Sequence, residues 1–255
     1  MNDQKINWVT YLKVIGILAV ILGHIASPLS TFIFSWHMPL FFIVSGFFMD
    51  LDVSFEVFFI KNFKRLMVPY FIFSMVGLLV EILKRYVLHR EALNLWDELQ
   101  GIFIGMDMAS LVHTYAFVLW FLPTLFFARV MLYTINRYIT NLWLRCIVIS
   151  LIFKTSFYIN VPFALDNAFN ALLFVFIGNL YFRLYQDEKI LYFLPILLLG
   201  IYVIVGFPLL DMATKHYSSV FLNILWAVSL IYTMIITLKQ FHLSTQLLTL
   251  WGATQ

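Results

Sequence analysis

Charged residues are scarce in this 255-residue chain: only 11% are Asp, Glu, Lys or Arg, whereas about a quarter is usual in a soluble domain. Hydrophobic residues make up 63% of the chain, so there is too little polar surface to coat a water-soluble globule. Lipid is the solvent that suits such a surface, and helices satisfy their own backbone hydrogen bonds there. The composition therefore predicts an integral membrane protein.

Cysteine and blocks of basic residues are also nearly absent. The single cysteine, Cys146, excludes an internal disulfide and any zinc site built from several cysteines. The histidines form no recognisable ligand set and the carboxylates are few and scattered, so no metal site is predicted. The net charge of +3 comes without a basic run that could neutralise a series of phosphates, which argues against nucleic acid as a partner.

Long apolar stretches take the place of polar surface. A spanning helix needs about 20 mostly apolar residues, and we find eight candidate stretches. No repeat or linker divides the chain. We therefore expect an all-α fold, a polytopic transmembrane bundle of about eight spanning helices that forms a single domain over residues 1–255. The expected helices cover residues 8–27, 32–50, 66–88, 112–134, 142–158, 163–182, 190–209 and 217–238.

The distribution of Lys and Arg favours a cytoplasmic N-terminus. With that orientation, the inner segments carry more basic residues than the outer segments, as the positive-inside rule requires. The inner residues are Lys5, Lys61, Lys64, Arg65, Arg137, Arg145, Arg183, Lys189 and Lys239. The outer residues are Lys84, Arg85, Arg90 and Lys215.

Two polar residues, Lys13 and His24, interrupt the first apolar stretch. They are eleven positions apart, a spacing that returns to nearly the same helix face roughly 16 Å further along the axis. An ionisable residue inside a span is a functional candidate, because its desolvation must be compensated. The alternative is that Lys13 snorkels to the inner surface and His24 lies at the outer surface.

A second polar cluster lies in residues 35–49. His37 precedes Pro39 at the expected start of the second helix, where proline is well tolerated. We therefore expect His24 and His37 to face one outer region. Ser45 and Gly46 follow, and small residues there allow another helix or a ligand to approach closely. The alternatives are a capping or interfacial His37 and plain helix packing at Ser45-Gly46.

These two segments resemble the start of membrane acyltransferase family 3, in particular its fucose 4-O-acetylase-like branch. The family begins with a basic residue, ten further residues and a histidine, and Lys13 and His24 match this motif. Many members have Arg at the first position, so Lys13 is a departure. The second motif, HMPLFFxxSG, is matched from His37 to Gly46.

Three shorter matches follow in the family's order. Arg65 with Pro69-Tyr70 matches R-x-x-x-P-Y, Trp120 begins a W-F-L match, and residues 162–178 resemble a later stretch with Phe and Gly. The resemblance therefore covers the whole chain. Residues 243–255 look like the approach to a further helix, so we expect that the chain is shortened and lacks the family's last one or two spanning helices.

The resemblance implies transfer of an acyl group, by default acetyl, from cytoplasmic acyl-CoA to a sugar hydroxyl of an envelope or exported polysaccharide. The implied partners are the lipid bilayer, acetyl-CoA as co-substrate, and a glycan or lipid-linked sugar as acceptor. The implied location is a bacterial inner membrane. The expected site residues are the catalytic His24 and His37, the donor-binding Lys13 and Arg65, and the substrate-binding Trp120 and Ser45.

Within this scheme, His24 is the expected general base. Imidazole exchanges protons near neutral pH, so it can take the proton of the sugar hydroxyl and return it to the leaving thiolate. His37 would orient the acceptor, stabilise the oxyanion or carry the acyl group briefly. For Trp120 the alternative is core or lipid packing, and for Arg65 it is an anchor at the inner surface.

Two other functions stay open from the sequence. One is a polysaccharide or small-molecule exporter in which Lys13 and His24 relay a proton or substrate. The other is an inactive relative, because of the shortened C-terminus. Product formation that depends on acyl-CoA distinguishes the enzyme from both.

Overall fold

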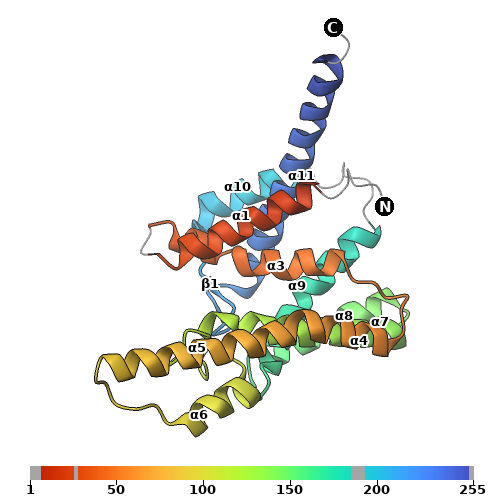
Figure 1. The fold of residues 1–255 in the computed structure, drawn as a ribbon. Helices are drawn as coiled ribbons and strands as arrows, with labels where there is room; N and C mark the ends of the chain where they lie inside the picture. Colours follow the sequence, from red (N-terminus) through yellow and green to blue (C-terminus); the bar gives the residue numbers. More distant parts are fainter. Residues whose placement is uncertain (1–6, 26–27, 185–192, 253–255) are drawn as a thin grey trace. The chain divides into compact units, whose positions relative to one another are not determined.

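The computed structural model describes residues 7–25, 28–184 and 193–252, and most of them are helical (Figure 1). The chain forms two compact units. The first contains residues up to Val44 together with Leu180–Asp211 and His216–Gln255, and the second contains Ser45–Asn179 with Met212–Lys215. The single catalytic domain expected from the sequence stays a prediction.

The first unit is built around a long C-terminal helix. Helices α1 and α10 both pack against α11, and Gly16 of α1 lets this helix approach Leu40 and Phe41 closely. The elements of this unit are α1 (Asn7–Gly23), α2 (Ser30–Phe34), the first part of α3 (His37–Phe47), α10 (Leu194–Val205), α11 (Val220–Gly252) and the strands β1 (Leu210–Asp211) and β2 (His216–Tyr217). The antiparallel hairpin of β1 and β2 corrects the expectation of a purely helical chain.

Two helices of the second unit, α4 and α8, begin with a side chain that caps the first turn. Ser54 Oγ accepts the Val57 amide at the start of α4, and Asn141 Oδ1 accepts the Leu144 amide at the start of α8, as N-caps do. The elements are α4 (Phe55–Asn62), the π-helical turn η2 (Phe63–Met67), α5 (Val68–Val87), α6 (Leu95–Gln100), the π-helical turn η3 (Gly101–Gly105), the 3₁₀ turn η4 (Phe117–Trp120), α7 (Phe121–Tyr138), α8 (Leu142–Thr155) and most of α9 (Leu165–Leu184).

Gly46 sets the contact between the end of α3 and α9. A Cβ atom at this position would collide with the Val175 carbonyl oxygen and would lie 2.8 Å from the Asn179 amide nitrogen. The Asn179 side chain also donates to the Gly46 carbonyl at 3.3 Å. The close approach predicted at Ser45-Gly46 is therefore that of another helix.

Four helices in the described residues are long and apolar enough to span a membrane. Two shorter apolar helices, Trp8–Gly23 and Leu194–Val205, fall below the length that a span needs. The predicted count of about eight spans is therefore not supported, although the helices agree with an integral membrane protein. The four candidates are Ser30–Phe47, Phe55–Val87, Phe117–Tyr138 and Val220–Gln240.

Helix ends account for most of the difference in count. The first predicted span, 8–27, ends at Gly23, and the fifth, 142–158, is a helix of only 14 residues. The third was expected to begin at residue 66, but its helix begins at Phe55 because Ser54 caps it. The last continues past residue 238 to Gly252, so the segment expected to approach a further helix is part of α11 as far as that residue.

Candidate functional site

His37 is the first residue of α3 and its side chain is buried, with 2% of its surface exposed. Its Nδ1 lies 2.9 Å from the carbonyl oxygen of Ile33. A carbonyl oxygen only accepts, so Nδ1 carries the proton and the lone pair of the neutral ring is on Nε2. The backbone thus holds His37 in the tautomer that accepts a proton at Nε2.

His24 repeats this arrangement directly after α1. Its Nδ1 lies 2.8 Å from the carbonyl oxygen of Val20, again four residues earlier. The same argument places the ring proton on Nδ1 and the lone pair on Nε2. Unlike His37, His24 is exposed, so it is open to a reactant.

Phe34 links the two histidines. Its ring centroid lies 6.0 Å from that of His24 and 5.1 Å from that of His37. Both imidazoles therefore lie against one aromatic side chain from α2. This agrees with the expectation that the two histidines face one region.

The junction between α2 and α3 is fixed by a residue far along the chain. Ser35 is buried, its Oγ donates to the Phe32 carbonyl at 2.6 Å, and it accepts Trp226 Nε1 at 2.8 Å. Trp226 belongs to α11, so this helix positions the start of α3. No pattern in the sequence predicts this pair, because its members are 191 residues apart.

Trp36, directly before His37, carries a buried donor without a partner. Its indole nitrogen is buried and makes no hydrogen bond within the described residues. Leaving such a group unpaired costs about 1–3 kcal/mol, and native structures rarely keep one without a reason. Trp36 is therefore a candidate donor to a substrate oxygen, which the sequence analysis missed.

Lys13 lies on α1 at the edge of its buried face. It follows the buried Leu12 as His24 follows the buried Gly23, and both polar residues are exposed. The helix is continuous from Asn7 to Gly23, and the His24 amide still bonds to the Val20 carbonyl at 3.2 Å. The alignment of Lys13 with His24 along one side, predicted from their spacing, therefore follows from this helix.

The other three predicted site residues belong to the second unit. Arg65 is exposed in η2, Ser45 is half-buried near the end of α3, and Trp120 is buried at the last residue of η4. The Trp120 carbonyl accepts the Thr124 hydroxyl at 2.9 Å, at the start of α7. That these residues and the histidines form one site stays a prediction.

Arg129 is a buried cation that the sequence analysis overlooked. Only 9% of its surface is exposed, its Nε donates to Asn62 Oδ1 at 2.8 Å, and its Nη1 donates to the Ser45 carbonyl at 2.5 Å. Among the residues described, no carboxylate lies within ion-pair distance of it. Arg129 could have been predicted as a functional candidate on the same ground as Lys13, since both are basic residues within an apolar stretch.

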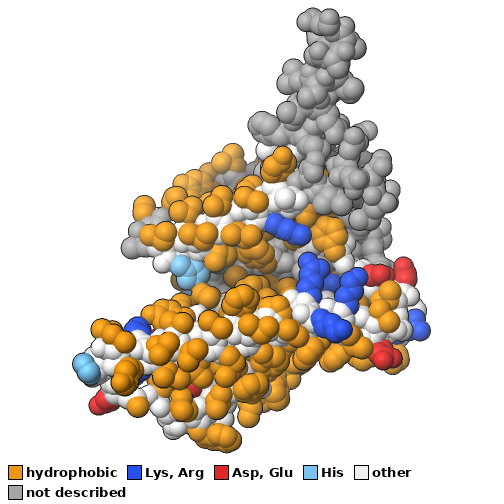
Figure 2. Space-filling view, in the orientation of Figure 1, with side chains coloured by type: hydrophobic (Ala, Val, Ile, Leu, Met, Phe, Trp, Pro, Cys, Tyr) orange, Lys and Arg blue, Asp and Glu red, His pale blue; other side chains and the backbone are white. Residues whose placement is uncertain are grey.

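Basic side chains gather at one end of the second unit, over α4 and η2 (Figure 2). Lys61, Lys64 and Arg65 are exposed there and form no ion pair with any described residue. At the other end of α5, Glu81 binds Lys84 and Arg85 at 2.6 and 2.9 Å.

The turn between β1 and β2 holds a paired cation as well. Lys215 pairs with Asp166 and also donates to the Asn160 side chain at 2.9 Å. Of the basic residues expected on the inner side, Lys5 and Lys189 lie outside the described residues. Within the described part of the chain, no group of three or more His, Cys, Asp or Glu side chains is arranged to hold a metal ion.

One family model matches residues 6–252, and it describes an acyltransferase domain. No curated protein and no solved structure matches the chain. The family match spans both compact units, including all six predicted site residues.

Proposed function

This chain belongs to acyltransferase family 3, and from that premise we propose that it transfers an acyl group, by default acetyl, from acyl-CoA to a sugar hydroxyl of an envelope or exported polysaccharide. The donor would bind from the cytoplasm, with the N-terminus on the same side of a bacterial inner membrane. The acceptor would be a glycan or a lipid-linked sugar.

The observation that carries this proposal is a pair of histidines whose tautomers are fixed by backbone hydrogen bonds. His24 and His37 both give their Nδ1 proton to a backbone carbonyl and lie against the Phe34 ring. A base that must take a proton from a hydroxyl needs a neutral ring whose second nitrogen accepts. Two such rings in one place suit acyl transfer better than a lone interfacial histidine does.

In the proposed reaction, the sugar oxygen attacks the thioester carbonyl carbon while His24 Nε2 takes the hydroxyl proton. The tetrahedral intermediate then collapses, the carbon–sulfur bond breaks, and the proton passes from His24 to the leaving CoA thiolate. His37 orients the acceptor hydroxyl. The indole of Trp36 donates to the oxygen on which negative charge develops, as an oxyanion donor does.

The donor end would be held by Lys13 and Arg65, since the phosphates of CoA require cations. Arg65 lies among exposed basic side chains without carboxylate partners in the described residues, which supports this role. Trp120 and Ser45 would line the path of the substrate. The Ser45 carbonyl is held by Arg129, so the backbone of this segment is fixed.

The test is transfer of labelled acetyl from acetyl-CoA to envelope glycan in membranes that carry the chain. His24→Ala should lower transfer about 10²–10⁴-fold, the usual contribution of a general acid–base group. His37→Ala should lower transfer as well, because the acceptor hydroxyl loses the residue that orients it. His89→Ala is the matched control, because His89 is exposed in a loop beyond α5. Full activity of His24→Ala would remove His24 as the base.

The same membranes test the other functions. Export of a glycan without any acylated product would overturn the proposal in favour of a transporter. Absence of label in every sample, with inserted protein and acceptor glycan present, would identify an inactive relative.

A further inference from the structure

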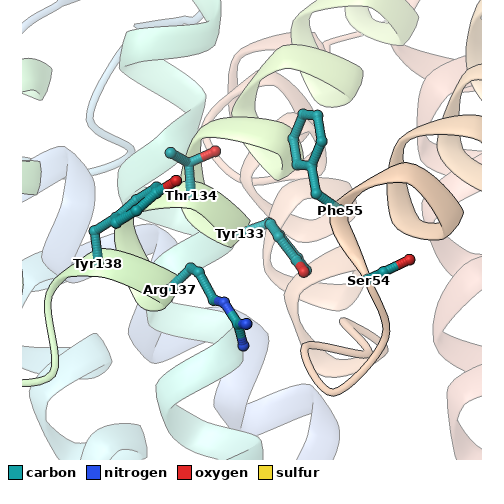
Figure 3. Close-up of a pocket in the computed structure, with 6 residues that line it drawn as sticks. All are labelled: Ser54, Phe55, Tyr133, Thr134, Arg137 and Tyr138. Atoms are coloured by element: carbon teal, nitrogen blue, oxygen red, sulfur yellow. The ribbon is translucent and has the colours of Figure 1, made fainter.

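The second unit has a cavity of about 360 Å³ between the start of α4 and the last turns of α7 (Figure 3). Small-molecule sites usually enclose about 300–1,000 Å³, so its size suits a ligand rather than a single water. The site described above uses none of its lining residues. These are Ser54, Phe55, Tyr133, Thr134, Arg137 and Tyr138.

Tyr133 is the fixed wall of this cavity. Its hydroxyl donates to the Val53 carbonyl at 2.7 Å, and its ring stacks on Phe58 with centroids 4.5 Å apart. A second ring, that of Tyr138, is 82% exposed. The cavity thus offers a rigid aromatic wall and a second aromatic face that is open to a planar ligand.

Arg137 supplies the positive charge. It is exposed and makes no hydrogen bond or ion pair with any described residue, whereas its neighbour Arg145 donates to the Ile139 carbonyl at 2.5 Å, to Asn136 Oδ1 and to the Thr140 carbonyl. Arg145 therefore caps the end of α7, and Arg137 is available to a ligand. The forked guanidinium group is suited to phosphate.

Two hydroxyl groups complete the polar lining. Ser54 Oγ already accepts the Val57 amide, so its own proton is available to an acceptor in the cavity. Thr134 Oγ1 donates to the Val130 carbonyl at 2.9 Å, so its lone pairs are available to a donor such as a ribose hydroxyl. No carboxylate lines the cavity, so nothing in it repels an anion.

We propose that this cavity binds the nucleotide end of acyl-CoA: adenine stacks on the exposed Tyr138 ring and Arg137 holds the phosphate on the ribose. The inference rests on the proposed function for the identity of the donor. It adds a subsite to the residues proposed to hold that donor, and it assigns the nucleotide to the end of α7.

An anionic lipid headgroup shares the phosphate chemistry, and Arg and Tyr are common at membrane surfaces. The two sources differ in one respect: only the nucleotide brings a planar ring for Tyr138. A binding measurement in discs of neutral phosphatidylcholine therefore separates them, since these discs contain no anionic lipid.

The experiment measures the Kd of CoA, and of adenosine 3′,5′-bisphosphate as the isolated probe, for the full chain in such discs. Arg137→Gln should raise both Kd values about tenfold or more, the usual effect of losing a hydrogen bond to a charged group. Tyr138→Ala should raise them roughly fivefold or more through lost stacking. Lys154→Gln and Trp143→Ala are matched controls, because both side chains are exposed and lie outside the cavity.

A kinetic comparison then separates this inference from the proposed function. Arg137→Gln should raise KM for acetyl-CoA while kcat stays the same, and it should leave KM for S-acetylpantetheine, which lacks the nucleotide, unchanged. Loss of CoA binding in Arg137→Gln supports the nucleotide site even if the wild type transfers no acetyl, an outcome that would overturn only the proposed function.

Two results would overturn the inference. One is acetyl transfer by the wild type with the same Kd and KM in Arg137→Gln. The other is a loss of phosphatidylglycerol binding in Arg137→Gln without any change in CoA binding, which would make the cavity a lipid headgroup site.

Discussion

At His24 and His37, a backbone carbonyl four residues earlier decides which nitrogen can act. This arrangement needs no carboxylate partner, which suits a chain with so few acidic residues. The tautomer also does not depend on packing between distant parts of the chain, because the accepting carbonyl belongs to the same short segment of backbone as the ring. Asparagine or glutamine at these positions would keep a hydrogen bond but lose the base.

At Trp36, the indole nitrogen has no hydrogen-bond partner among the described residues, so its removal can test a role in function apart from a role in stability. Trp36→Phe removes a buried donor that has no partner in the described residues, so the melting temperature should not fall by more than the change in ring size requires. Acetyl transfer should fall roughly tenfold or more if the donor serves the oxyanion. Thermal unfolding and transfer assays on one preparation check this, and unchanged transfer would leave the indole without a catalytic role.

At the scale of helices, Gly46 tests a close helix contact and Gly200 provides the control. Gly46→Ala places a methyl group against the backbone of α9, so we expect a loss of about 1–3 kcal/mol. Gly200→Ala in α10 meets nothing within 4 Å and should stabilise that helix slightly. Thermal unfolding in detergent compares the melting temperatures of the two variants. Equal melting temperatures would contradict the close contact between Gly46 and α9.

Arg129 ties three helices of the second unit through α3, α4 and α7. Arg129→Met leaves the Asn62 side chain and the Ser45 carbonyl without their donor, and each loss costs about 1–3 kcal/mol. The melting temperature should fall clearly, whereas Lys154→Met, at an exposed position of α8, should change it little. Equal melting temperatures for Arg129→Met and the wild type would show that solvent or lipid replaces this network.

Apolar runs predict where helices lie but not where they end. Each of the eight expected stretches contains a helix, because a long run of apolar residues favours a helix wherever it occurs in the chain. Their ends depend on single contacts, such as the Ser54 cap or the breaks at Gly23 and Phe47, so the number of spans was overestimated.

The candidate site was predictable only in part. Lys13 and His24 could be aligned from helix geometry alone. The shared contact with Phe34 and the Ser35–Trp226 hydrogen bond could not be predicted, since they depend on tertiary packing.

For the whole molecule, orientation in the membrane is the property that the charges predict. Residues before α4 and after α5 should lie on opposite sides, because the helix of residues 55–87 is long enough to cross. In a Cys146→Ser background, Arg90→Cys should react with an impermeant maleimide in intact cells, and Asp52→Cys should react only after lysis. The reverse pattern would place the start of α4 outside and contradict the orientation predicted from the charges.

The π-helical turn η2 between α4 and α5 has a consequence for insertions and deletions. Such a turn holds one residue more than the α-helix needs, so deletion of a single residue within 63–67 can restore a regular helix. The bulge accommodates the extra residue locally, so α5 would keep its orientation relative to α4 after the deletion. Tyr70 would keep its hydrogen bond to the Ile102 carbonyl, and Gly77 would keep its contact with Ala116. This segment should therefore tolerate the loss of one residue, whereas the same deletion in the regular part of α5 would turn everything beyond it by about 100°.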